Sequence, residues 1–125
     1  AIAVTQVMPE LEGHFDGLSI RVPTIVVSLS DCTFLLKNKT TKEEINQVLV
    51  EASRNPRYAY ILAVTSEPLV SSDFIGDPHS AIVDLSLTKV IDGDLVKIVA
   101  WYDNEWGYSN RLVEMAMLVG NGISQ

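Results

Sequence analysis

Hydrophobic and polar residues recur along this chain with two periods, one typical of strands and one typical of helices. Several segments alternate between apolar and polar residues or are rich in β-branched residues, and these predict strands. They are residues 18–22, 25–36, 60–64, 81–84, 86–91 and 95–102. Polar stretches that contain glycine or proline lie between them, so we expect short strands that end at turns and loops.

A helical period appears between Thr41 and Asn55, where apolar residues recur at i, i+3, i+4 and i+7. This spacing predicts an amphipathic helix with one apolar face. Thr41 or Thr40 is expected to cap its N-terminus, and Glu44 lies at capping-box spacing from Thr41. The pair Asn55-Pro56 is expected to end the helix, since proline disfavours a helical residue before it.

Residues 106–119 predict a second full helix, which we expect to close at residues 120–122, Gly-Asn-Gly. Its expected buried stripe consists of Leu112, Val113, Met115, Ala116 and Val119. Residues 1–8 resemble the tail of another helix, which Pro9 ends. The chain opens within this pattern and has no initiator Met, so we expect it to be a piece of a longer protein.

The order of these elements predicts the fold class. Asp92-Gly93-Asp94 between two apolar runs is a hairpin signal, because Asp-Gly tolerates the positive φ of a type I′ turn. Strands joined by tight turns favour antiparallel or mixed pairing. We therefore expect an α+β fold, with a mixed or antiparallel sheet and helices packed on one face. Residues 1–125 contain no linker or repeat and predict a single domain.

Composition and charge exclude several functions. The net charge of −7 argues against a nucleic-acid partner, which normally selects a basic surface. No apolar run approaches the length of about 20 residues that a membrane-spanning helix needs. The single cysteine cannot form an internal disulfide, which is typical of a protein in the reducing cytoplasm.

The most informative stretch is WYDNEWGYSNR, residues 101–111, at the predicted change from strand to helix. Such corners often build small-molecule sites. The amide of Asn104 could read a carboxamide ligand, or Asn104 could simply be a turn residue or the N-cap of the helix. Tyr102 and Tyr108 flank the corner, where aromatic side chains serve more often in packing than in binding.

Arg21 is the second candidate, because it lies inside the predicted strand 18–22 between Ile20 and Val22. A guanidinium on a half-buried strand needs an anion. The residues leave two interpretations open. Arg21 could clamp a phosphate or carboxylate with two hydrogen bonds, or it could be exposed or paired with an acidic side chain.

Other reactive residue types carry weaker signals. Nothing near Cys32 in the sequence would lower its pKa, so we interpret it as a small buried apolar residue. His14 and His79 lie far apart in polar loops, and no metal site is expected. Asp77, His79 and Ser80 could mimic part of a catalytic triad, but Asp-Pro-His first predicts a turn.

Three runs resemble, in order, segments of the phosphorylating glyceraldehyde-3-phosphate dehydrogenase family. They are VMPELEGHFDGLSIRVPT, LVSSDFIGDPHSAIVD and VKIVAWYDNEWGYSNRLVEMA. The resemblance covers nearly the whole chain and implies the larger C-terminal portion of the catalytic domain, without the Rossmann NAD-binding domain. By position, Arg21 matches the arginine that binds substrate phosphate or inorganic phosphate. Asn104 matches the asparagine that holds the nicotinamide carboxamide, Tyr108 a tyrosine of the nicotinamide pocket, and Tyr102 an aromatic residue beside the catalytic centre.

The departures from the family pattern are large. Its catalytic cysteine motif, histidine base and glycine-rich dinucleotide fingerprint are absent, and Cys32, His14 and His79 do not match them. No catalytic residue is therefore expected in this chain. The resemblance implies that in the parent enzyme a Cys thiolate attacks the aldehyde to give a thiohemiacetal. Hydride then passes to NAD or NADP, and phosphate cleaves the thioester that results. We expect this chain alone to bind no cofactor and to be inactive.

The resemblance also implies partners and leaves alternatives. It implies a phosphorylated aldehyde and inorganic phosphate as ligands of the parent, and a cytoplasmic homo-oligomer, the family tetramer. Erythrose-4-phosphate dehydrogenase has similar segments, although Tyr102 and Tyr108 favour the glyceraldehyde enzyme because the erythrose enzyme tends to vary there. A third interpretation is a non-catalytic domain that self-associates through its sheet.

Overall fold

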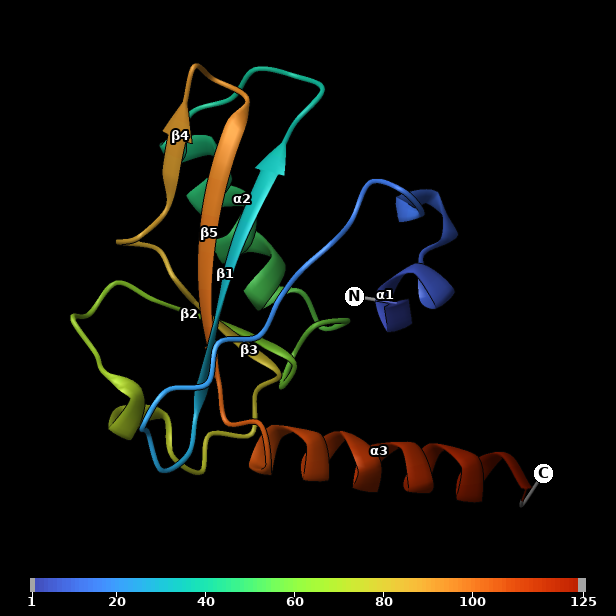
Figure 1. Cartoon of the computed structure of the whole chain (residues 1–125). Coiled ribbons are helices and arrows are strands. Elements are labelled where there is room, and N and C mark those ends of the chain that lie inside the picture. The colour runs from blue at the N-terminus through green and yellow to red at the C-terminus, as the bar shows by residue number, and fades with distance from the viewer. Residues whose placement is uncertain (1, 124–125) are drawn as a thin grey trace.

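The computed structural model describes residues 2–123, and the side chains of residues 3–122. One mixed sheet forms the centre of the molecule, with α2 behind it and α1 and α3 at its periphery (Figure 1). The elements are α1 (Ile2–Val7), the 3₁₀ turn η1 (Pro9–Leu11), β1 (Ser28–Leu35), α2 (Lys42–Arg54), β2 (Leu62–Thr65), the 3₁₀ turn η2 (Ser71–Phe74), β3 (Ala81–Asp84), β4 (Lys89–Ile91), β5 (Leu95–Tyr102) and α3 (Trp106–Ile123). This arrangement confirms the predicted α+β class.

Strand β5 is central, because it pairs along both edges. On one edge β1 runs antiparallel to it over its whole length, from Ser28 opposite Tyr102 to Leu35 opposite Leu95. On the other edge β3 and β4 pair with opposite ends of β5, both antiparallel. Strand β2 pairs with β3 in parallel and completes the order β1-β5-β3-β2. The carboxyl end of β5 therefore lies between β1 and β3, where the sequence places the candidate site.

Local backbone geometry sets where several strands begin. Val27 and Tyr60 adopt left-handed φ values of 74° and 64°, which an extended strand does not accommodate. Strand β1 accordingly begins at Ser28 rather than at residue 25, and β2 begins at Leu62 rather than at residue 60. A turn after Asp84 likewise shortens the predicted strand 86–91 to β4.

The predicted capping box of α2 is confirmed. The Thr41 hydroxyl accepts from the Glu44 N–H at 3.2 Å, and the Glu44 carboxylate accepts from the Thr41 N–H at 3.0 Å. The Asn46 amide and the Lys42 ammonium donate to carbonyl groups of the turn after β3. These bonds fix the N-terminal half of α2 to the sheet.

The hairpin between β4 and β5 also forms as predicted. Asp92 and Gly93 both adopt positive φ, 50° and 78°, and the Asp94 N–H donates to the Ile91 carbonyl. This is the geometry of a type I′ turn. Lys39 pairs with Asp94 at 2.9 Å and holds the hairpin against the residues that follow β1.

The strand predicted at residues 18–22 is wrong. This segment forms no strand in the structure, and Leu18, Ile20 and Val22 are 82 %, 78 % and 55 % exposed. A segment with alternating apolar and polar residues forms a strand only if a neighbouring strand pairs with its backbone. The described part of the chain provides no such partner for residues 18–22. Arg21 therefore lies on an exposed, irregular connection rather than in the sheet.

Helix α3 differs from its prediction in two ways. It continues through Gly120 and Gly122 to Ile123, so the expected closure at 120–122 is wrong. Its expected buried stripe is exposed: Leu112, Val113, Met115, Ala116 and Val119 all lie in solvent. Figure 1 gives the reason, since only the start of α3 lies at the sheet and the rest extends away from it.

The hydrophobic core lies beneath the carboxyl end of β5. Val27, Phe74 and Ile82 form its buried centre, and Trp101 packs against them. The Phe74 and Trp101 rings stack with centroids 5.2 Å apart and an angle of 16° between their planes. None of the helices within residues 2–123 is long and apolar enough to cross a bilayer.

Candidate functional site

The corner between β5 and α3 encloses a shallow hollow of about 270 Å³. Its lining residues come from the end of β5, the turn that follows it, the first two turns of α3 and the residue before β3. They are Ser80, Tyr102, Asp103, Asn104, Gly107, Tyr108 and Arg111. Two of the three predicted binding residues, Asn104 and Tyr108, thus share one hollow with Tyr102. Arg21 does not line it.

Arg21 is exposed on the connection before β1. It forms no ion pair with another side chain in the part of the chain that the structure describes. An internal salt bridge therefore does not account for it here, and its guanidinium is accessible to a phosphate or carboxylate from outside the chain.

Asn104 is exposed at the rim of the hollow and contacts β1. The Ser28 hydroxyl lies 3.4 Å from the Asn104 Oδ1 atom and donates to it. The oxygen keeps a second lone pair and the amide nitrogen can donate, so the side chain can both accept from and donate to a ligand. Tyr108, one turn further along α3, is 68 % exposed and presents its ring to solvent.

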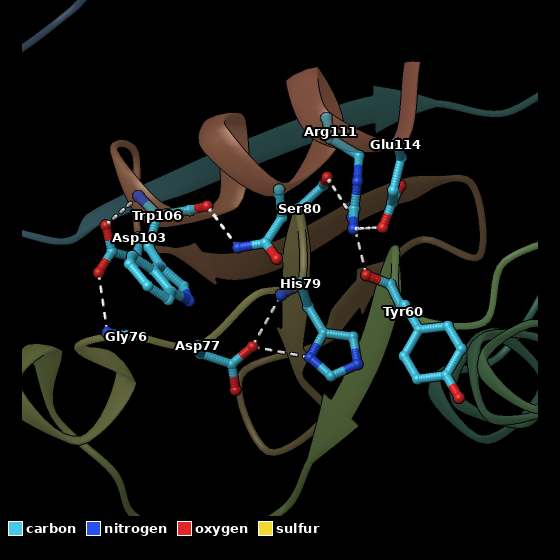
Figure 2. Close-up of polar contacts among 10 residues, drawn as sticks. Tyr60, Gly76, Asp77, His79, Ser80, Asp103, Trp106, Arg111 and Glu114 are labelled. Atoms are coloured by element: carbon cyan, nitrogen blue, oxygen red, sulfur yellow. Dashed lines mark hydrogen bonds and ion pairs between the residues drawn. The ribbon is translucent and has the colours of Figure 1, made fainter. Parts of the chain in front are cut away.

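Asp103, rather than Asn104, caps α3. Its Oδ1 atom accepts from the Trp106 N–H at 2.9 Å (Figure 2) and from the Glu105 N–H at 3.1 Å. Its carbonyl accepts from the Gly107 N–H, the first helical bond. The predicted alternative of Asn104 as helix N-cap is therefore wrong, because its neighbour already satisfies the free N–H groups, whereas Asn104 does lie in a turn.

The second Asp103 oxygen reaches another segment. Oδ2 accepts from the Gly76 N–H at 2.9 Å, so one buried carboxylate joins the start of α3 to the loop before β3. These hydrogen bonds, led by that from Trp106 and then that from Gly76, lower the pKa of Asp103 below its ordinary value. Asp103 is not among the predicted site residues, although an Asp three residues before a helical pattern is itself a cap signal.

Arg111 is a second residue that the sequence analysis missed. Its guanidinium donates to the Tyr60 carbonyl at 2.7 Å and to the Ser80 hydroxyl at 3.2 Å, and it pairs with Glu114 (Figure 2). It thereby ties the second turn of α3 to the starts of β2 and β3. No sequence signal distinguishes it from an ordinary exposed helix residue, because its partners are backbone and hydroxyl groups distant in the chain.

Gly107 brings the same helix close to the loop before β3. A Cβ atom added at this buried glycine would lie 3.0 Å from the His79 carbonyl oxygen. Any other residue would force the His79 carbonyl to move away, and glycine avoids this crowding. The first turns of α3 are therefore fixed against residues 76–80 through Asp103, Gly107 and Arg111.

The structure does not assemble a catalytic triad around His79. The Asp77 carboxylate lies 2.7 Å from the His79 Nδ1 atom and also accepts from the His79 N–H, as in the predicted turn. The Ser80 hydroxyl instead accepts from Arg111, and Figure 2 shows the imidazole turned away from Ser80. The Asp77–His79 pair is thus part of the loop that supports α3.

The remaining reactive residues lie apart from the hollow. Cys32 is half-buried on β1, and burial raises the pKa of its thiol, with a further rise from Asp31. His14 lies in an exposed loop. Within residues 2–123, no three His, Cys, Asp or Glu side chains gather into a group that could hold a metal ion.

Comparisons with known proteins assign the family. Residues 1–104 match the family model described as glyceraldehyde 3-phosphate dehydrogenase, C-terminal domain. Glyceraldehyde-3-phosphate dehydrogenase of Zymomonas mobilis subsp. mobilis is 55 % identical over 116 residues, which cover 93 % of this chain and 34 % of that protein. The enzyme of the same name from Cereibacter sphaeroides is 48 % identical over 120 residues, 96 % of this chain and 36 % of its own length.

A third relative, glyceraldehyde-3-phosphate dehydrogenase 3 of a Nostoc species, is 48 % identical over 119 residues, 95 % of this chain and 35 % of that protein. The chain thus spans about a third of the length of the curated relatives it matches. The matched residues include the β5 strand that leads to the hollow and the connection that carries Arg21. This chain belongs to the family of glyceraldehyde 3-phosphate dehydrogenase C-terminal domains.

Proposed function

We propose that this chain forms one wall of the active site of an NAD(P)-dependent glyceraldehyde-3-phosphate dehydrogenase that oxidises and phosphorylates its substrate in glycolysis. The observation that carries the proposal is the hollow in which Asn104 and Tyr108 lie together, in a chain of this family. Residues 1–125 then contribute a C-terminal portion of the catalytic domain, and the Rossmann domain lies elsewhere in the parent.

The lining of the hollow fits a nicotinamide ring with its carboxamide. Asn104 offers an amide, which can pair with a carboxamide, and Tyr108 offers an aromatic face at the rim. Asn104 would fix the rotation of the carboxamide and Tyr108 would bound the ring. The cofactor, when bound, supplies the hydride acceptor, and the contribution of these two residues is orientation.

Arg21 would bind phosphate, either that of the aldehyde substrate or inorganic phosphate. Its exposed guanidinium, without an internal ion pair in the described residues, has two N–H groups that match two phosphate oxygens. In a chain with net charge −7, a specific arginine is needed to attract an anion to this region. Arg21 and Asn104 thus hold the two reactants, and neither performs the chemistry.

The chain alone is expected to be inactive, because it lacks the family's nucleophilic cysteine and histidine base and the dinucleotide domain. Purified residues 1–125, mixed with glyceraldehyde 3-phosphate, phosphate and NAD or NADP, should form no reduced cofactor. Detectable turnover by this chain would refute the assignment of its role as one wall of a larger site.

Substitutions in the parent enzyme test the two binding roles separately. Asn104→Ala should raise the KM for the cofactor, and Arg21→Ala should raise the KM for the phosphate ligands, each by about tenfold, the worth of one to two hydrogen bonds to a charged or polar group. Asn38→Ala and Arg54→Ala, which remove the same side-chain types from exposed positions elsewhere, are the matched controls. Unchanged KM values in the first pair would refute the roles.

The same enzyme should be assayed with erythrose 4-phosphate as the competing aldehyde. Tyr102 and Tyr108 favour glyceraldehyde 3-phosphate, and a higher kcat/KM for the erythrose compound would reverse the assignment of substrate.

We also propose a cytoplasmic homo-oligomer. Its support is the sheet face that carries Leu35, Ile91 and Leu95 in exposed positions. Sedimentation of the parent enzyme tests this association. Sedimentation of the chain alone tests the alternative that it is a non-catalytic oligomerisation domain.

A further inference from the structure

We propose that Asp103 is a positioning residue, which holds Asn104 in the orientation that recognises the carboxamide of a nicotinamide ring. This inference rests on the proposed function of Asn104. It adds a residue that does not itself touch the ligand, because Asp103 is only 4 % exposed and both of its carboxylate oxygens are engaged by backbone N–H groups.

The geometry of these bonds supports the inference. One Asp103 oxygen caps α3 through Glu105 and Trp106, and the other holds Gly76 at 2.9 Å. We call these bonds the clamp. Asn104 lies between Asp103, whose carboxylate makes the clamp, and Glu105, the first residue along the chain whose N–H the clamp binds. Its backbone is therefore fixed from both sides, although its side chain is exposed.

The clamp also fixes the distance between α3 and the sheet. Gly76 precedes β3 in the chain, and β3 pairs with β5 at Trp101 and Ala100. The carboxylate thus closes a ring of contacts that runs from β5 through Asp103 to Gly76 and back through β3. A side chain with a single acceptor oxygen can make either the helix cap or the bond to Gly76, but not both.

Two substitutions separate the two halves of the clamp. Asp103→Asn keeps the size of the side chain, but its amide nitrogen must face an N–H group at Gly76 or at the helix. Asp103→Ser retains a capping oxygen and lacks the second oxygen for Gly76. Thr41→Ala is the matched control, since it removes a comparable cap from α2, which contributes no residue to the hollow.

The measurement is the dissociation constant of the parent enzyme for NAD and for its 3-acetylpyridine analogue, obtained by calorimetry. The analogue keeps the ring and the carbonyl group but lacks the amide NH₂. If Asn104 pairs with both ends of the carboxamide, wild-type enzyme should prefer NAD by roughly tenfold, the worth of about one hydrogen bond. Asn104→Ala, Asp103→Asn and Asp103→Ser should each bring this preference close to one, while Thr41→Ala leaves it unchanged.

The outcomes distinguish the inference from the proposed function. If the Asp103 variants bind both cofactors more weakly by the same factor, Asp103 is only structural and the inference is overturned, while the role of Asn104 stands. If Asn104→Ala also keeps the preference for NAD, the assigned role of Asn104 fails, and the inference falls with it. A loss of preference in Thr41→Ala would also overturn the inference, because general destabilisation would then suffice.

A measurement on the unsubstituted enzyme keeps the test valid even if the Asp103 variants do not fold. Binding at Asn104 should strengthen the clamp by linkage, so NAD should slow hydrogen exchange of the Gly76 and Trp106 amides more than the analogue does at equal saturation. Equal protection by the two cofactors would overturn the inference.

Discussion

Gly107 is the position at which one added methyl group tests the geometry of the β5–α3 corner. Alanine in place of glycine inside a helix is worth about 1 kcal/mol of stability. At Gly107, however, the new Cβ atom would lie 3.0 Å from the His79 carbonyl oxygen, 3.8 Å from its carbon and 3.9 Å from the Ser80 Cα atom. These are backbone atoms and cannot rotate away, so overpacking should cost about 1–3 kcal/mol.

Gly120→Ala provides the matched control in the same helix. A Cβ atom at Gly120 would meet nothing within 4 Å, so this variant should show only the gain in helix propensity. The propensity terms cancel between the two variants, and their difference in unfolding free energy isolates the contact with His79. We expect Gly107→Ala to be less stable than Gly120→Ala by roughly 1–3 kcal/mol, or roughly 4–12 °C in Tm.

Thermal and urea unfolding of the two variants and the wild type measures this difference. Equal stabilisation by both substitutions would refute the close approach of α3 to residues 76–80. A second readout is binding in the parent enzyme. Since the added methyl group displaces the turn that carries Asn104 and Tyr108, Gly107→Ala should weaken cofactor binding, whereas Gly120→Ala should not.

Three further predictions concern stability and reactivity. Hydrogen bonds from Trp106 and Gly76 lower the pKa of Asp103 below its ordinary 3.8, so the carboxylate stabilises the fold above that pH and this contribution is lost as pH falls through the lowered pKa. The unfolding free energy measured by urea titration should therefore fall less steeply with decreasing acidic pH in Asp103→Asn than in the wild type. Thr41→Ala, which removes the capping box of α2, should cost about 1 kcal/mol in the same titrations. Because burial raises the pKa of Cys32, alkylation at neutral pH should be slower in the folded chain than in urea, and equal rates would contradict its burial.

Features that depend on neighbouring residues in the chain could be predicted from the sequence. The capping box of Thr41 and Glu44 requires only a spacing of three residues, and the hairpin requires only that Asp92 and Gly93 tolerate positive φ. The interior strand β5 also agrees with its prediction, because it is apolar except at Lys97 and has partners on both edges. In these cases local preference and tertiary contact favour the same structure.

Features that depend on distant partners could not be predicted. The segment around Arg21 has the alternation of a strand, but no strand of the described residues pairs with it. The apolar stripe of α3 has the right period for burial and still lies in solvent, because periodicity identifies a face and not what covers it. Arg111 was missed for the same reason, since its acceptors at Tyr60 and Ser80 become neighbours only in the folded chain.

The candidate site itself shows both limits within a few residues. Sequence reasoning located Asn104 and Tyr108 at a strand–helix corner, and the structure brings them to one hollow. It did not identify what holds them there, because the clamp joins Asp103 to Gly76, a backbone N–H group with no signature of its own. Candidate ligand-binding residues can thus be recognised by type and position, whereas the residue proposed to orient them was hidden by its ordinary role as a helix cap. The orientation of Asn104 consequently depends on a loop that precedes β3 as much as on the strand that leads into it.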